Sequence, residues 1–166
     1  MATVCERITA LREKMKENGI TVYVVPSTDC HESEYVCPHY RARAYMTGFT
    51  GSAGTAVITM DKAGLWTDGR YFLQAEDQLR GTGIHLFRMG EPGVPTVEEY
   101  VKEELCAGGC VGFDGKTMGA VSADKFRKTA MEKGGSIYTE KDLVGEIWPD
   151  RPQISDEKVW ILEKCW

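Results

Sequence analysis

Long apolar runs are missing from this 166-residue chain. No stretch approaches the roughly 18 consecutive apolar residues that a membrane-spanning helix requires. Charged side chains interrupt residues 1–19 repeatedly, so the apolar segment of a secretory signal peptide is also missing. We therefore expect a cytoplasmic protein that does not bind membranes.

An excess of positive charge is missing too. Lys and Arg together number 20, against 25 Asp and Glu, which gives a net charge of −5. A protein that binds the nucleic-acid backbone needs a concentrated positive field, so we expect no nucleic-acid partner. Six cysteines without an export signal are typical of reduced thiols rather than of a disulfide framework.

The length corresponds to one domain with a short appendage, at about 150 residues per domain. The composition changes at the stiff, polar segment Pro149–Pro152, and we assign residues 1–150 to one domain and 151–166 to a linker and the start of a second domain. Apolar residues crowd the last stretch: Val159, Trp160, Ile161, Leu162 and Trp166. Such an end needs a surface to bury against. It docks on this domain or precedes a larger segment, and we favour the second.

Apolar spacing predicts alternating helices and strands. The stripe Val4, Ile8, Leu11 and Met15 predicts a helix over residues 3–18, and the β-branched run 21–25 predicts a buried strand. Residues 53–60 and 63–67 are expected to form a hairpin. The other predicted elements are helices over 41–46, 68–80, 96–106 and 122–133, the last with Phe126 and Met131 inward, and strands over 84–89, 110–113 and 136–139. This order favours the α/β class, with a mixed sheet flanked by helices.

Several short motifs resemble known sites but are incomplete. His31–Tyr35 lacks the second histidine of a zinc-binding helix, because position 35 is Tyr. Four potential zinc ligands occur within ten positions, at Cys30, His31, Cys37 and His39, but their spacing matches no ordinary zinc finger. Residues 112–117 lack the first glycine of a phosphate-binding loop. We predict no catalytic residue and no metal site in this chain, and we expect His85 to be packed within its strand.

Arg70 follows a predicted strand and a tight turn, within Trp66–Phe72. We place it in the first turn of the following helix, where a cation opposes the positive end of the helix dipole. Two interpretations remain open from the residues themselves. Arg70 is a surface side chain that pairs with Asp68, or it is an anchor for an anion or a carbonyl on a rigid strand–turn–helix.

Four blocks, taken together, resemble the N-terminal domain of Xaa-Pro aminopeptidases, in the creatinase/prolidase or pita-bread metallopeptidase group. They are Pro26–Tyr35, Tyr45–Ala56, Leu65–Ala75 and Glu146–Pro152. The resemblance is greatest to the long, three-domain form of these enzymes. It implies a mixed β-sheet flanked by helices, with a ribonuclease-H-like shape.

The resemblance also implies a role. In this family the domain holds no metal, and two divalent ions, usually manganese, are bound in a C-terminal catalytic domain of the same chain. The N-terminal domain helps to limit access to short peptides with proline at the second position. Its substrate-contacting arginine falls on Arg70, with Tyr71 and His31 as further candidates for substrate binding, and Asp29, Glu34 and Tyr35 at the cleft rim. Tyr45 and Phe49 are expected to pack beneath it.

We thus expect the non-catalytic domain of a homodimeric Xaa-Pro aminopeptidase, inactive when alone. The alternative is a free-standing binding or assembly module that pairs with a separate catalytic chain or with itself. A creatinase-like protein or an Xaa-Pro dipeptidase is a third interpretation. Residues 67–75 and the lengths of the blocks favour the aminopeptidase.

Overall fold

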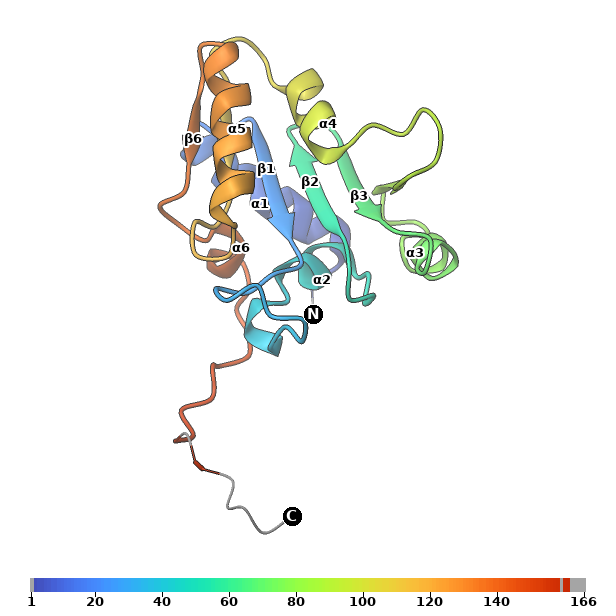
Figure 1. Ribbon diagram of the computed structural model, residues 1–166, viewed down its shortest axis with the longest axis vertical. Helices are drawn as coiled ribbons and strands as arrows, with labels where there is room; N and C mark the ends of the chain where they lie inside the picture. Colours follow the sequence, from blue (N-terminus) through green and yellow to red (C-terminus); the bar gives the residue numbers. More distant parts are fainter. Residues whose placement is uncertain (1, 159, 162–166) are drawn as a thin grey trace.

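The computed structural model describes residues 2–158, 160 and 161, and its centre is one six-stranded β-sheet (Figure 1). The strand order is β4-β3-β2-β1-β5-β6. The strands are β1 (Val22–Pro26), β2 (Thr55–Thr59), β3 (Ala63–Thr67), β4 (His85–Arg88), β5 (Cys110–Gly112) and β6 (Ser136–Tyr138). β2 is antiparallel to both β1 and β3, whereas the other pairs are parallel. The sheet is therefore mixed, as predicted.

Helices cover both faces of this sheet, and each face has its own apolar core. The helices are α1 (Val4–Glu17), α2 (Ala42–Thr47), α3 (Phe72–Gln78), α4 (Val97–Glu104), α5 (Ala120–Glu132) and α6 (Leu143–Glu146), with a 3₁₀ turn, η1, at Pro38–Tyr40. Buried side chains of α1, α2, α3 and α6 pack on one face. Those of α4 and α5 pack on the other, and Figure 1 shows these two helices in front of the sheet. This arrangement confirms the expected α/β class.

Local sequence signals fix several helix ends. The side chains of Thr3 and Glu6 each bond to the other's backbone amide and so begin α1, and Thr96 and Glu99 do the same for α4. Gly48 ends α2 with φ 74°, in the left-handed region that favours glycine. These ends agree with the predicted ones to within a residue or two.

The structure corrects three predictions. α3 begins at Phe72 rather than at position 68, because residues 68–71 form a turn. Met131 of α5 is 61% exposed, since Phe126 and Ala130, one helical turn apart, occupy the inward face instead. His85 is exposed on the edge strand β4 rather than packed. The short elements η1 and α6 carry no apolar period long enough to predict.

Contacts with the domain continue up to about Arg151 and are followed by exposed residues. The ring of Trp148 stacks on Tyr45 with centroids 4.3 Å apart, and the Arg151 guanidinium donates to the carbonyl of His39. Trp160 is 74% exposed, and the predicted apolar end also includes Val159, Leu162 and Trp166, which lie outside the described residues. Among the helices that the structure describes, none has the length and apolarity to cross a membrane.

Candidate functional site

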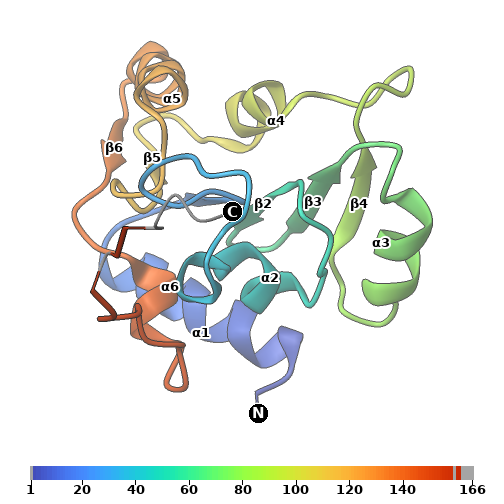
Figure 2. The same ribbon diagram turned by 60° about the horizontal axis from the view of Figure 1, so that its bottom comes forward.

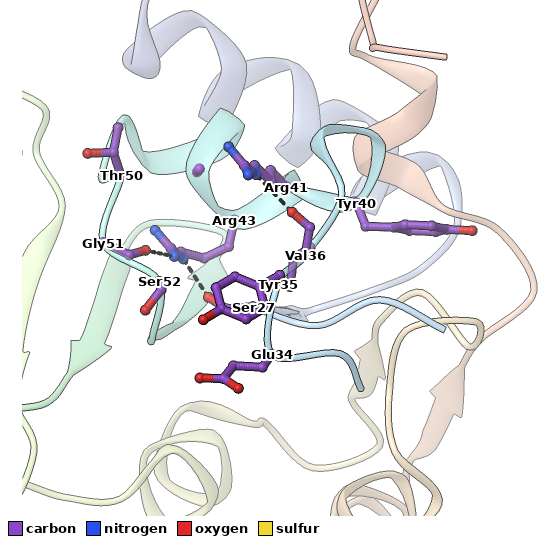
Figure 3. A pocket seen from close by; sticks show the side chains of 11 residues that line it. Ser27, Glu34, Tyr35, Val36, Tyr40, Arg41, Arg43, Thr50, Gly51 and Ser52 are labelled. Atoms are coloured by element: carbon purple, nitrogen blue, oxygen red, sulfur yellow. Dashed lines mark hydrogen bonds between the residues drawn. The ribbon is translucent and has the colours of Figure 1, made fainter. Parts of the chain in front are cut away.

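A cavity of about 240 Å³ lies beside the edge of the sheet where β1 ends and β2 begins. Figures 2 and 3 show the loops that gather there, from the segment after β1, from α2 and from the α2–β2 connection. Its lining residues are Ser27, Glu34, Tyr35, Val36, Tyr40, Arg41, Arg43, Ala44, Thr50, Gly51 and Ser52. Charged, hydroxyl and aromatic groups thus converge on one hollow, as in many ligand sites.

Arg43 forms the buried side of this cavity, with 4% of its surface exposed. Its guanidinium donates hydrogen bonds to the Ser27 hydroxyl (2.8 Å) and the Gly51 carbonyl (Figure 3). It also donates to the Phe49 carbonyl (2.5 Å). No described carboxylate forms an ion pair with it. Burial of the charge lowers the pKa of Arg43 to about 10, so it remains a cation at neutral pH.

The loop between α2 and β2 is held from two further directions. Thr50 accepts a hydrogen bond from the Gln74 amide, and its own backbone amide donates to Gln78, so α3 fixes the loop. Gly51 is packed so closely that a Cβ there would lie 2.3 Å from the ring of Phe49 and 2.8 Å from that of Tyr71. Only glycine lets the loop approach these rings.

Arg70 lies outside the cavity, in the turn between β3 and α3. Its guanidinium binds Asp68 through Nε (2.9 Å) and Nη2 (2.8 Å), and its side chain is 70% exposed. This pair lowers the pKa of Asp68 to about 2 and raises the pKa of Arg70. The predicted place in the first helical turn is therefore wrong: Arg70 precedes α3, and Asp68 rather than a helix dipole sets its environment. In the described part of the chain Nη1 has no acceptor.

Tyr71 connects Arg70 with the cavity. Its hydroxyl lies 2.7 Å from that of Ser52, a lining residue, and the Arg70 guanidinium carbon lies 5.3 Å from its ring centroid. The hydrogen bond to Ser52 lowers the pKa of Tyr71. Phe49, fully buried as predicted, meets the Tyr71 ring edge to face with centroids 5.9 Å apart. Arg70, Tyr71 and the cavity rim thus form one continuous surface.

His31 lies apart from this surface. It is exposed in the loop after β1, with Nδ1 3.2 Å from the Cys30 sulfur, and lines a different hollow together with residues 116–120. Asp29 is buried, and its carboxylate accepts the backbone amides of His31 and Ser33, which lowers its pKa. Asp29 therefore holds the loop in shape; it borders the hollow at His31 and not the cavity lined by Arg43.

The structure brings together some of the predicted site residues and adds others. Arg70 and Tyr71 adjoin the cavity, and Glu34 and Tyr35 line it, whereas His31 does not. Sequence reasoning missed Arg43, since a lone arginine in a short helix carries no local signal that it is buried. Ser52 lies within the block Tyr45–Ala56, but only its contact with Tyr71 shows that it belongs to the site. Residues 2–158, 160 and 161 contain no group of three His, Cys, Asp or Glu side chains placed to hold a metal.

Residues 7–139 match the model of the creatinase/prolidase N-terminal domain family. The chain belongs to this family. It is similar to aminopeptidase P2 of Arabidopsis thaliana, with 44% identity over 163 residues, and to a probable Xaa-Pro aminopeptidase P of Talaromyces stipitatus, with 47% over 159. These matches cover 95% and 94% of this chain but only 23% and 24% of the relatives. The chain spans about a quarter of the length of the curated relatives it matches.

Solved structures show the same relationship. The X-prolyl aminopeptidase of Caenorhabditis elegans, described as a cytosolic enzyme with a dinuclear active site, superimposes with a TM-score of 0.89 at 32% identity. That match covers 98% of this chain and 28% of the worm enzyme. The N-terminal domain of the cytoplasmic peptidase PepQ from Mycobacterium tuberculosis has the same fold, with a TM-score of 0.59 at 22% identity and 98% of its chain covered. The expected fold and family are confirmed.

Proposed function

We propose that this chain is the N-terminal, non-metal domain of an Xaa-Pro aminopeptidase and that it contributes peptide binding and limits substrate access. The observation that carries the proposal is the continuous surface formed by Arg70, Tyr71 and the rim of the cavity at Ser52. Among the described residues no acceptor takes the Nη1 donors of Arg70, while Asp68 binds its Nε and Nη2. A cation fixed in this way suits a peptide carbonyl or carboxylate.

The bond-breaking chemistry belongs to the rest of the enzyme. We expect two divalent ions, manganese by family resemblance, in a catalytic domain outside this chain. A metal pair of this kind supplies activated water for peptide hydrolysis. The substrates are short peptides with proline second, and the parent enzyme is expected to be a cytoplasmic homodimer. Both the relatives' names and the dinuclear site of the worm enzyme support this proposal.

Replacing Arg70 by alanine in the intact enzyme tests the proposed role. Loss of one hydrogen bond to a charged donor should lower kcat/KM for an Xaa-Pro peptide about tenfold or more, largely through KM. Metal content and circular dichroism should stay unchanged, because Arg70 is exposed and lies outside the apolar cores. Arg80→Ala, which removes another exposed and ion-paired arginine, serves as the matched control.

Unchanged kinetics in the Arg70 variant would remove this residue from the substrate site. The isolated 166-residue chain with added manganese should not cleave the same peptide. Turnover by the pure chain would contradict its assignment as the non-catalytic domain.

A further inference from the structure

The two arginines that line the cavity have one property in common. Neither Arg41 nor Arg43 forms an ion pair with any described carboxylate, although Glu34 lines the same cavity. Five other arginines each pair with an acid: Arg70, Arg80, Arg88, Arg127 and Arg151. The cavity is thus a local excess of positive charge in a chain whose net charge is −5.

Arg43 retains donors for a further acceptor. Each nitrogen of its guanidinium donates once, to the Ser27 hydroxyl and the carbonyls of Phe49 and Gly51. A guanidinium carries five N–H groups. One hydrogen on each of its two terminal nitrogens therefore has no acceptor within the described residues. A buried charge is ordinarily paired, and all three acceptors here are neutral.

Arg41 adds a second cation at the exposed side of the cavity. Its Nε donates to the Val36 carbonyl at 3.0 Å, and neither terminal nitrogen has an acceptor in the described part of the chain (Figure 3). No carboxylate among the described residues pairs with Arg7 or Arg12 of α1 either, but these two arginines do not line this cavity. Two cations with free donors therefore face one hollow.

The size and lining of the cavity suit one end of a ligand rather than a whole drug-sized molecule. About 240 Å³ is smaller than the roughly 300–1,000 Å³ of typical small-molecule pockets. Tyr35, Val36 and Ala44 provide apolar surface, and Ser27 and Ser52 provide hydroxyl groups. A planar carboxylate is the anion whose two oxygens best match paired guanidinium donors.

We propose that this cavity binds the C-terminal carboxylate of a short peptide whose backbone passes Arg70. The proposal rests on the function proposed above and adds a preference for a free carboxyl terminus. Ser52 belongs to the cavity and contacts Tyr71, so a peptide held at the Arg70 turn has a continuous path to the two arginines. The cavity thereby selects peptides that are short enough for their end to reach it.

Two peptides that differ only at the C-terminus test the inference in the wild-type chain. The tripeptide Ala-Pro-Ala with a free carboxylate should bind about tenfold tighter than its C-terminal amide in calorimetric titration. Backbone amide signals of Ser27, Tyr35 and Ser52 should shift in the NMR spectrum. Equal affinities, including no measurable binding of either peptide, or shifts confined to other residues, would overturn the proposal.

Arg41→Gln should reduce the preference for the acid over the amide at least threefold, and the exposed position of Arg41 lets the variant fold. Arg12→Gln removes one positive charge from α1, away from the cavity, and should retain the preference. In the intact enzyme, equal kcat/KM for acid and amide would overturn the carboxylate site while leaving the proposed function in place. An enzyme that cleaves neither peptide would overturn the proposed function itself.

Discussion

Two arginines flank the candidate site in opposite environments. Arg70 is exposed and neutralised by Asp68, only two residues away in the chain. Arg43 is buried and bound to neutral groups, one of which belongs to Ser27, 16 residues away. The contrast separates two tasks of one residue type: Arg70 presents donors from a turn that does not depend on it, whereas Arg43 holds together the loops that form the cavity.

The pKa shifts express the same contrast. The nearby Asp68 carboxylate raises the pKa of Arg70, while burial lowers the pKa of Arg43 to about 10. A neighbouring opposite charge stabilises the ionised form, and burial disfavours it. The cost of burying Arg43 is offset by its hydrogen bonds, so these bonds should be the more important for folding.

Replacing each arginine by methionine in turn should give the largest difference in stability between the two regions. Arg43→Met leaves the carbonyls of Phe49 and Gly51 without their donor and should lower the free energy of unfolding by about 3 kcal/mol. Arg70→Met should leave the urea midpoint nearly unchanged, because exposed ion pairs contribute little. Similar losses of stability in the two variants would contradict the assigned roles.

Two glycines, one in each region, provide a second and smaller contrast. Gly51→Ala places a methyl group against the rings of Phe49 and Tyr71 and should cost about 2 kcal/mol of stability through overpacking. Gly69→Ala adds a methyl group whose contact with the Phe72 ring, at 3.8 Å, is ordinary. Thermal unfolding measures both variants. A Gly69 variant as unstable as the Gly51 variant would show that the turn is as constrained as the loop and would contradict the contrast.

The smallest expected effect on stability comes from the titration of the Asp68 carboxylate. Its pKa of about 2 lies below the ordinary 3.8, so the ion pair stabilises the fold above pH 3.8. That contribution is lost as the pH falls through about 2. NMR titration of the Asp68 carboxyl carbon should show this low midpoint, and Arg70→Met should return it toward the ordinary value. A midpoint near 3.8 in the wild-type protein would mean that the pair does not persist in solution.

Most of the fold could be predicted because its signals are local. The apolar stripe of α1 and the capping boxes at Thr3 and Thr96 lie within a few residues of the elements they define. The hairpin of β2 and β3 is predicted by two apolar runs on either side of a short turn. The beginning of α3 was misplaced because Asp68 forms a turn with Arg70, an alternative that Asp side chains offer next to helices.

The candidate site could be predicted only in part. The resemblance to the family pointed to Arg70 and Tyr71, which adjoin the cavity. His31 was a candidate on the same ground, but it faces another hollow. The residues that line the cavity all lie between the end of β1 and the start of β2, but residues up to 25 positions apart meet there, and only the folded connection brings them together. Arg43 gave no signal at all, because the acceptors that bury it come from loops before and after its own helix.

The amino-acid sequence by itself determined the α/β class, the order of nearly all elements and the family. Each depends on patterns within a block of neighbouring residues, where backbone geometry and local hydrogen bonds decide the outcome. Only the tertiary structure decided that Arg43 is buried with no carboxylate of the described residues beside it, that Ser52 meets Tyr71, that residues 68–71 form the turn at Arg70 and that His31 lies elsewhere. These facts depend on which loops come together at the ends of β1 and β2. That arrangement is decided by packing between segments that are distant in the sequence.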